Sequence, residues 1–403
     1  MIPFEREFPL AQARRRVENE LTHLGLDWRV QQHGAALHTT VVELHDHAGM
    51  LPCTGVGKGR REFSLTGALY EACEHYLSLH HDCSLDHAVL PAQDVPTGMG
   101  APIDALLAEQ ADVNLACRIY TGFLDGSCKA YPLALSRPTY LDSPSTDDAF
   151  DYVSLSRYAS NSGTAIGATF AEAALHAVNE CIERDDVSRF LRQQFHDDAD
   201  APLRLLDARG IGSVLRRDWA EAEAEVGASI TLLDISHHTA AHTYLAFAAR
   251  PGRPQHLYGA GTSADAVHAA LRALTELVQL HTVADNVPHV RDDLAREVRR
   301  LQPWRQLHRS CVADLPALLA RRRLECVSIP RRSRTGTVKD ELERCMTALA
   351  DEGYRPLVHV LYSRPDTVTL CQVLVPGFDR YYLVSRGGIV VPGFARGRQH
   401  GHA

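Results

Sequence analysis

The sequence lacks the features of a membrane-spanning, secreted or nucleic-acid-binding protein. No apolar run approaches the roughly 20 residues that cross a bilayer, and the charged N-terminus has no apolar signal-peptide core. The net charge is -8 and the pI is near 6.3, which gives no general basic footprint for nucleic acid. We therefore expect a cytoplasmic protein with no membrane and no nucleic-acid partner.

Paired cysteine spacing is also absent, although the chain contains ten cysteines. Scattered cysteines are typical of small buried residues in a reducing compartment and not of a disulfide framework. The 22 histidines include adjacent pairs such as His237-His238, but none has a Cys or His partner at zinc-site spacing. We expect these histidines at surface or helix-capping positions.

The pattern of apolar residues predicts alternating helices and strands. Helical periodicity is found over 10–26, 62–81, 102–109, 170–194, 210–226, 264–283, 290–301, 313–322 and 339–353. Strand patterns occupy 36–42, 116–121, 129–135, 229–235, 243–249, 357–362 and 368–375, and 82–101 reads as a loop. With no low-complexity segment and no clean linker, the chain is expected to form a single large α+β domain.

One pattern occurs three times: a glycine-rich turn leads into a helix with two polar acceptors three residues apart. The pairs are Glu71/Glu74, Glu180/Glu183 and Glu276/Gln279. Residues three apart share a helix face, and partly buried carboxylates there need a cation or hydrogen-bond donors. Two glutamate pairs supply the hard oxygen ligands that Mg²⁺ prefers, and Mg²⁺ usually accompanies phosphates. One pair alone is ordinary on a solvated helix, so it is the repetition that favours a ligand site.

Several candidate residues keep two interpretations. Lys58 lies between two glycines and either contacts phosphate through a glycine turn or is a solvated lysine. Arg184 is either a phosphate ligand or an ordinary partner of Glu180. Glu276 and Gln279 either face a ligand or form a polar face without one, and Asn161 caps a turn or borders the site.

The same motifs resemble the YcaO family. Gly57-Lys58-Gly59 with Glu71-x-x-Glu74 resembles its first motif, and Gly259-x-Gly261 with Ala273-Leu274-x-Glu276-x-x-Gln279 its third. The second is the most specific: Gly163-Thr164-Ala165-x-Gly167, Thr169-x-x-Glu172-Ala173 and a helix ending in Glu180-Cys181-Ile182-Glu183-Arg184-Asp185. Val375-Pro376-Gly377 is similar to a later family motif, so the resemblance covers nearly the whole chain.

The resemblance implies a YcaO-type domain that activates peptide backbone amides with ATP and Mg²⁺. It implies an N-terminal helix and strands in 1–60, a catalytic core in 61–390 and a C-terminal tail in 391–403. By resemblance, Glu183 and Arg184 are catalytic, and the metal ligands are Glu71, Glu74, Glu180 and Glu183. The nucleotide-binding residues that the resemblance implies are Lys58, Asn161, Glu172, Arg184, Glu276 and Gln279.

The products and partners implied by the resemblance stay open. Azoline formation and thioamidation are both expected options, with amidine formation behind them, on a ribosomal precursor peptide. The expected partners are an E1-like or a TfuA-like protein, and a homodimer is compatible with the family. A non-catalytic paralogue that scaffolds the precursor, or a stand-alone member acting on the translation machinery, would explain the same motifs.

The sequence departs from the family pattern at three positions on the nucleotide side. Gly67 replaces a small hydroxyl residue, Ala168 replaces an Asn, and His281 replaces an Arg. We therefore expect weaker or altered nucleotide binding. The ending Val391-Pro392-Gly393-Phe394 lacks the alternating prolines of many azoline-forming members, yet it is too apolar for a polar free tail. We expect it to reach the active site.

Overall fold

The structure is a computed structural model that describes residues 4–47, 49–50, 53–80, 87–207, 211–250, 256–330 and 336–393. Its helices are α1 (Leu10–His23), α2 (Arg61–His80), α3 (Ala101–Ala108), α4 (Leu133–Ser136), α5 (Phe170–Leu191), α6 (Ser213–Val226), α7 (Ala266–Asn286), α8 (Pro288–Leu301), α9 (Arg305–Val312), α10 (Leu315–Arg321) and α11 (Val338–Asp351). Its strands are β1 (Asp27–His33), β2 (His38–His45), β3 (Thr54–Gly59), β4 (His87–Pro91), β5 (Asn114–Gly122), β6 (Cys128–Pro132), β7 (Thr164–Gly167), β8 (Leu203–Leu206), β9 (Ile230–Asp234), β10 (His242–Ala248), β11 (Tyr258–Ser263), β12 (Leu324–Val327), β13 (Leu357–Ser363) and β14 (Thr369–Leu374).

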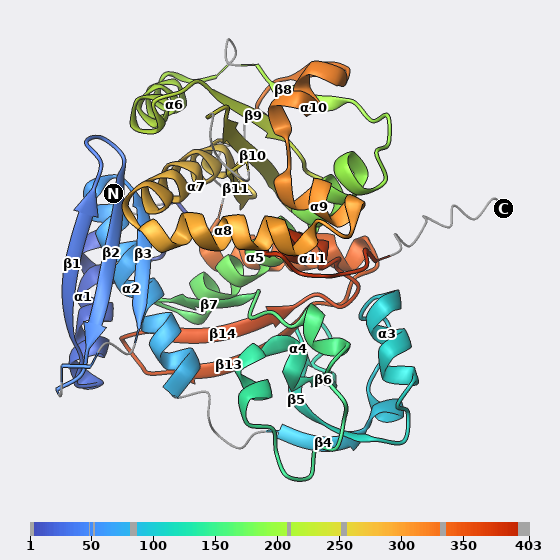
Figure 1. The fold of residues 1–403 in the computed structure, drawn as a ribbon. Helices are drawn as coiled ribbons and strands as arrows, with labels where there is room; N and C mark the ends of the chain where they lie inside the picture. Colours follow the sequence, from blue (N-terminus) through green and yellow to red (C-terminus); the bar gives the residue numbers. More distant parts are fainter. Residues whose placement is uncertain are drawn as a thin grey trace.

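The strands of the described residues form three sheets, which confirms the predicted α+β class. The orders are β1-β2-β3, then β11-β10-β9-β8-β12, and β4-β5-β13-β14-β7 with β6 paired to β5. Among the described strands, only β8 and β12 pair in parallel, and the other pairs are antiparallel. Figure 1 shows the β1–β3 sheet on one side of the molecule, the β8–β11 sheet above, and the β13–β14 sheet below α5.

Two of the three long helices, α5 and α7, begin at a residue whose side chain caps the helix N-terminus. Thr169 accepts a hydrogen bond from the Glu172 amide (3.2 Å) at the start of α5, and Asp265 accepts one from the His268 amide (2.8 Å) at the start of α7. Helix α5 is buried along most of its length because small and branched apolar residues such as Ala174 and Val178 pack against β14 and α11. It therefore forms the centre of the molecule.

The glycine turns predicted at 55–59 and 259–261 lie in strands β3 and β11, so this part of the sequence interpretation was wrong, whereas Gly163 of the second copy lies in a turn before β7 with a φ of 83°. Four of these glycines, Gly55 and Gly57 of β3 and Gly259 and Gly261 of β11, lie directly against the helix that follows each strand. A Cβ on Gly57 would lie 1.8 Å from the Ser64 carbonyl oxygen, and one on Gly261 would lie 2.3 Å from the Ala269 oxygen. Glycine is required because strand and helix backbones touch, and not because the chain turns.

Other elements were predicted incompletely. The loop predicted for 82–101 contains β4, with residues 81–86 outside the described part of the chain. The strand predicted for 129–135 ends at Pro132 and continues as α4. Strands β1, β8 and β12 and helix α9 were not predicted. Seven of the nine described cysteines are buried, as expected. Among the described residues, no helix has the length and apolar character to span a membrane.

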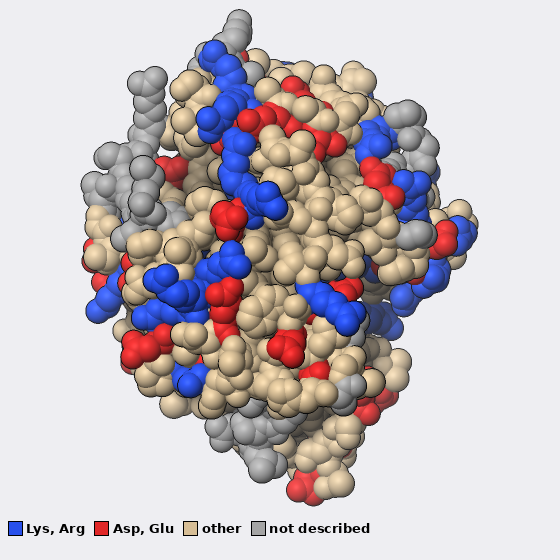
Figure 2. All heavy atoms as spheres, turned by 90° about the vertical axis from the view of Figure 1, so that its left-hand side faces the viewer, with Lys and Arg blue, Asp and Glu red and all other residues tan. Residues whose placement is uncertain are grey.

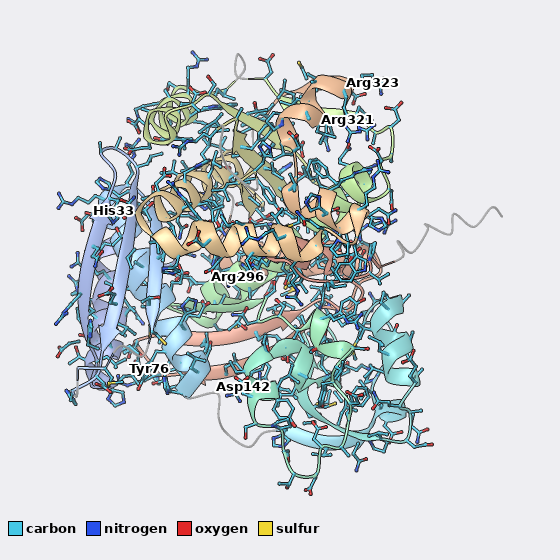
Figure 3. The ribbon with its side chains drawn as sticks, viewed as in Figure 1. His33, Tyr76, Asp142, Arg296, Arg321 and Arg323 are labelled. Atoms are coloured by element: carbon cyan, nitrogen blue, oxygen red, sulfur yellow. The ribbon has the colours of Figure 1, made fainter. Side chains whose placement is uncertain are left out.

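Basic side chains do not gather into one field on the face of the molecule that Figure 2 shows. On the face shown in Figure 2, Lys and Arg alternate with Asp and Glu, and uncharged residues cover most of the centre. The Arg321–Arg323 cluster lies at the end of α10, on the upper rim in Figure 3. Arg321 and Arg322 each lie 2.7 Å from Asp198, so both guanidinium groups are paired within the protein.

Candidate functional site

The acid-bearing helices meet at the edges of the three sheets. Strands β3, β7 and β11, which precede α2, α5 and α7, are each the terminal strand of a different sheet. Each of these helices packs on its own strand and also on the next edge strand: α2 contacts β7, α5 contacts β11 and α7 contacts β3. The three repeated units thus close into a ring (Figure 1). The polar pairs face its centre, because Glu180 acts on the charge of Glu74, and Glu276 acts on the charges of Glu71 and Glu183.

One side of this centre is anionic. The Ile166 amide on β7 donates to Glu74 (3.0 Å), and the Gly163 amide donates to Glu180 over a longer 3.4 Å. Burial raises the pKa of Glu74 well above its usual range, and the charges of Glu180 and Glu71 raise it further. The pKa of Glu71 is also raised, first by burial and then by Glu276. These carboxylates are close enough to destabilise one another's charge.

The other side is cationic. Lys58 forms an ion pair with Glu276, and burial of Glu276 is outweighed by Lys58, so its pKa falls below the usual range. Arg184 lies 3.5 Å from Glu180 and 5.2 Å above the Tyr382 ring. Burial raises the pKa of Glu183, while the cations Arg184 and Arg272 oppose this. Opposite charges therefore line one half-buried space.

Three nitrogens on this cationic side are buried without a hydrogen-bond partner among the described residues: Arg184 Nε, Arg272 Nε and His176 Nδ1. The two guanidinium nitrogens are donors, and His176 Nδ1 is a donor in the tautomer that carries its proton there. Buried polar atoms are normally paired, so orphaned donors beside a charged space indicate a missing acceptor. An anion such as a phosphate chain has oxygens of the required kind.

The donor set on the anionic side fits a hard cation. Four glutamates from two helices offer only carboxylate oxygens, the ligands of Mg²⁺. Glu183 accepts no hydrogen bond from any described residue, so its oxygens are available. None of the four glutamates belongs to a described group of three ligand atoms within 4.8 Å of one another. The four predicted metal ligands thus surround one space, but their carboxylate oxygens are not close enough together to coordinate a single ion in this conformation.

The remaining predicted nucleotide residues differ in position. Gln279 lies at the ring, where its Nε2 donates to the Val56 carbonyl (2.8 Å). Glu172 is buried, and its carboxylate accepts from the amides of Glu7 (2.6 Å) and Ala168 (3.1 Å), so it anchors the N-terminal segment. Asn161 is exposed, and its described hydrogen bond is made by its backbone carbonyl. Roles of these residues in nucleotide binding stay predictions.

Two residues of the cationic side were missed from the sequence. His176 lies four residues before Glu180, and Arg272 lies four residues before Glu276. This spacing puts each on the same helix face as the polar pair. The corresponding position before Glu71 is Gly67, so the repeat itself contained the signal.

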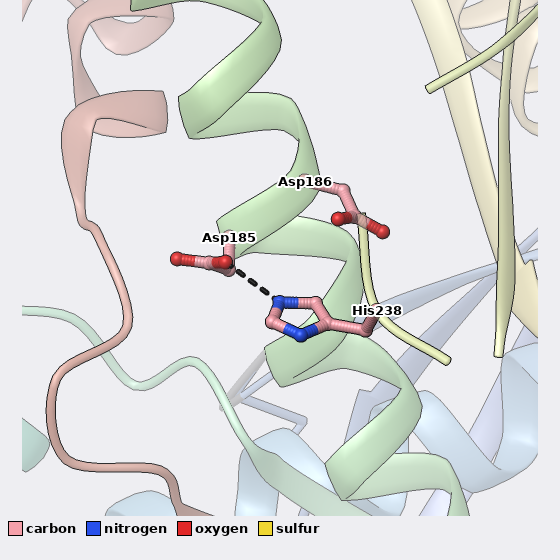
Figure 4. A group of neighbouring side chains, drawn as sticks. All are labelled: Asp185, Asp186 and His238. Carbon is pink, nitrogen blue, oxygen red and sulfur yellow. Dashed lines mark hydrogen bonds and ion pairs between the residues drawn. The ribbon is translucent and has the colours of Figure 1, made fainter. Parts of the chain in front are cut away.

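A second charged cluster lies on α5 beside the candidate site. Figure 4 shows Asp185, Asp186 and His238, whose ligand atoms all lie within 4.8 Å of one another. His238 Nε2 is 2.8 Å from Asp185, and its Nδ1 is 2.6 Å from Glu352. His238 is buried, so the expectation of a surface or capping histidine was wrong here.

This cluster is an ion-pair network and not a metal site. Both ring nitrogens of His238 face carboxylates, which leaves no lone pair for a metal. Burial opposes its charge, but the hydrogen bonds to Asp185 and Glu352 raise the pKa of His238 to about 9. Asp186 accepts from the His237 amide (3.0 Å) and the Thr243 hydroxyl (2.5 Å). Every carboxylate oxygen of the pair is used by the protein.

Comparison with protein families decides the relationship of this chain. A family model described as YcaO cyclodehydratase, ATP- and Mg²⁺-binding, matches residues 56–379. The chain belongs to the YcaO family. The resemblance seen in the motifs is therefore confirmed, and the family description agrees with the predicted cofactors, ATP and Mg²⁺.

Solved structures show that the fold is shared along the whole chain. The YcaO protein of Methanopyrus kandleri, bound with AMPPCP and Mg²⁺, is 17% identical with a TM-score of 0.68, covering 96% of both chains. A heterocyclase in complex with substrate and cofactor is 19% identical with a TM-score of 0.65, covering 93% of this chain and 53% of that one. The Escherichia coli microcin synthetase McbBCD complex gives 11% identity and a TM-score of 0.57, covering 87% and 88%.

Two curated relatives match a shorter part of this YcaO chain. A protein of Methanothermobacter thermautotrophicus is 27% identical over 233 residues, 56% of this chain and 57% of its own length. A protein encoded in the tfuA 3' region of Rhizobium leguminosarum bv. trifolii is 26% identical over 232 residues, 55% of this chain and 52% of its own length. The chain thus spans about half the length of these relatives.

Proposed function

We propose that this YcaO protein uses ATP and Mg²⁺ to activate a backbone amide of a ribosomally made precursor peptide. The observation that carries the proposal is the ring of three edge strands, which places carboxylates opposite cations with orphaned donors. A nucleotide triphosphate with its cation is the ligand that satisfies both sides. The relative bound with AMPPCP and Mg²⁺ and the heterocyclase bound with substrate support this assignment.

The proposed roles follow the position of each side chain. Glu71, Glu74, Glu180 and Glu183 would hold Mg²⁺, which neutralises phosphate charge during transfer. Arg184, Arg272 and His176 would donate to phosphate oxygens. Lys58 would hold Glu276 in place and border the phosphates. Gln279 would attach α7 to β3 through its hydrogen bond to the Val56 carbonyl. Glu172 and Asn161 are proposed at the periphery of the nucleotide site.

The chemistry explains why the site needs both charges. After a nucleophile adds to the amide carbonyl, the carbonyl oxygen must leave, and water is a poor leaving group. Transfer of the terminal phosphoryl group to that oxygen converts it into phosphate. Arg184 and Arg272 stabilise the negative charge on the phosphoryl oxygens as the bond to ADP breaks.

Two products fit this site. Attack by a Cys, Ser or Thr side chain gives an azoline, which the heterocyclase relatives favour. Attack by sulfide gives a thioamide, which the relative encoded in the tfuA 3' region favours. We infer accordingly that an E1-like partner would present the peptide in the first case and that a TfuA-like protein would act beside the enzyme in the second.

The test is turnover of a precursor peptide with ATP, Mg²⁺ and the neighbouring partner protein. Peptide-dependent ADP release together with a mass loss of one water identifies azoline formation. ADP release with exchange of one oxygen for sulfur identifies thioamidation. Tight nucleotide and peptide binding without ADP release would overturn the enzymatic proposal and favour the scaffolding paralogue.

A further inference from the structure

A cavity lies beside α5, which contributes Cys181 and Arg184 to its lining. Its polar lining residues are Tyr131, Ser162, Cys181, Arg184, Asp379, Arg380 and Tyr382, and the end of β14 and the segment after it form another wall. Arg184 lines this cavity and also lies 3.5 Å from Glu180, so it borders both the ring of edge strands and the cavity. A peptide amide that receives the phosphoryl group must lie next to Arg184, and this cavity offers it room.

Asp379 is the only carboxylate among the described residues that line the cavity. Its backbone is held on both sides, because its amide donates to Asp185 (2.6 Å) and its carbonyl accepts from the Ser188 hydroxyl (3.1 Å). Its Oδ1 accepts from the Tyr381 amide (2.9 Å), and Gly393 of the C-terminal segment contributes a second backbone hydrogen bond. A carboxylate has about four acceptor positions, so capacity remains.

The other polar groups of the cavity are unsuited to accept a proton. Arg380 donates to the carbonyls of Leu135 (2.8 Å) and Tyr158 (2.5 Å) and carries a permanent charge. The Cys181 thiol donates to the Val373 carbonyl (3.3 Å), and burial raises the pKa of Cys181 above its usual range. Arg184 is also permanently charged, and the remaining polar groups, the hydroxyls of Tyr131, Ser162 and Tyr382, are far weaker bases than a carboxylate. Elimination leaves the Asp379 carboxylate.

The surroundings of Asp379 suit a base at neutral pH. Burial, followed by the charge of Asp185 on α5, raises the pKa of Asp379 to about 6. Arg192 opposes this shift from the end of α5, and Tyr158 lies close enough to feel the carboxylate charge. Arg184 and Arg380 line the same cavity as Asp379. A group that titrates just below the working pH is ionised and still basic enough to accept a proton.

We propose that Asp379 is the base that takes the proton from the nucleophile attacking the peptide amide. The nucleophile X–H is a side-chain thiol or hydroxyl, or hydrogen sulfide. Its X–H electron pair forms the bond to the carbonyl carbon, the proton moves to Asp379, and the carbonyl π electrons move to oxygen. That oxygen then takes the terminal phosphoryl group of ATP with release of ADP. This assignment rests on the proposed function and adds the residue that the acidic helices do not provide.

The decisive variant is Asp379→Asn in the full-length protein. The amide retains Oδ1 for the Tyr381 hydrogen bond at nearly equal volume, so folding should persist. With the precursor peptide encoded beside the gene, the rate of product formation at pH 7.5 should fall about a hundredfold or more. Calorimetric affinity for Mg²⁺–AMPPCP should stay within about threefold. Asp200→Asn, at a fully exposed carboxylate, is the matched control and should match the wild type.

The pH profile separates a base from a structural carboxylate. The wild-type rate should rise with pH through about 6, and this limb should vanish in Asp379→Asn and partly return in Asp379→Glu. A rate for Asp379→Asn within about threefold of wild type, or an unchanged limb, overturns the role of Asp379 while the proposed function stands. A wild-type protein that releases no ADP with peptide overturns both.

Discussion

Helix α5 carries two acidic groups with opposite situations. Asp185 and Asp186 have every carboxylate oxygen engaged by His238, Arg189 or other donors. One turn earlier, Glu180 has only contacts of 3.4 Å and 3.5 Å, and Glu183 has no hydrogen bond from a described residue. The atoms of the Asp185 and Asp186 group lie closer together, whereas Glu180 and Glu183 have fewer hydrogen bonds and ion pairs to their oxygens. Unused acceptor capacity, and not closeness alone, distinguishes a ligand site from a structural network.

The strongest test of this comparison removes one charge from the unsatisfied group. Glu183→Gln should lower peptide-dependent ADP release by about a hundredfold to a thousandfold, because a ligand for Mg²⁺ beside the phosphates is lost. Stability in urea should change by less than about 1 kcal/mol, since the amide has nearly the same volume and relieves repulsion. Normal turnover by this variant would remove Glu183 from the site.

The matching test removes His238, the shared partner of the fully hydrogen-bonded Asp185 and Asp186 group. His238→Ala leaves Asp185 and Glu352 without their shared partner, and breaking a buried pair costs about 3–5 kcal/mol. Urea unfolding should show this loss, and a chelator should leave the wild-type midpoint unchanged. A wild-type midpoint that falls with chelator and recovers with zinc would contradict the ion-pair interpretation.

The pH dependence of this loss has a definite sign. Because the folded pKa of His238 is raised from 6.5 to about 9, its contribution is complete below pH 6.5 and disappears as pH rises through 9. The stability difference between wild type and His238→Gln should therefore shrink between these pH values. A difference that grows with pH would show that His238 is neutral in the folded protein.

A smaller effect is expected at the C-terminal segment. The Val391 amide donates to the Tyr158 hydroxyl (3.2 Å), and the Gly393 carbonyl accepts from Arg192 (2.5 Å), whereas residues 394–403 lie outside the described part. Deletion from Pro392 should lower product formation by at least about tenfold, or about 1.4 kcal/mol in the barrier. ATP affinity should stay within a few-fold, and deletion of 398–403 alone should do much less. Unchanged processing by the longer deletion would separate the tail from the site.

The smallest predicted effect concerns Gly67, which occupies on α2 the position that His176 occupies on α5 and Arg272 on α7. A Cβ there would meet only the Gly57 Cα at 3.8 Å, so serine fits. Gly67→Ser should tighten nucleotide binding about tenfold, since one hydrogen bond to a charged group contributes about 1.5 kcal/mol or more. Submicromolar ATP binding by the wild type would show that Gly67, Ala168 and His281 are already compensated.

The sequence predicted the long helices and their three polar pairs because these signals are local, whereas His176 and Arg272 were missed. The spacing of Glu180 and Glu183 is visible in any helix, and the apolar period of α5 is continuous. The edge strands β3 and β11 were not predicted because glycines such as Gly57 and Gly261 are typical of turns. These positions require glycine because the strand contacts the backbone of the following helix, and a local sequence pattern does not show that contact. His238 lies 53 residues from Asp185, so no local pattern could connect them.

Because each of α2, α5 and α7 rests on two edge strands, the three sheets depend on one another in a closed cycle. Opening one sheet edge removes support from the next helix, and with it from the next sheet. Amide protons of β3, β7 and β11 should therefore exchange with solvent in shared opening events, although each strand belongs to a different sheet. A ligand held at the centre of the ring would slow amide exchange in all three strands together. Ligand binding could therefore be detected from the exchange rates of amides that do not contact the ligand.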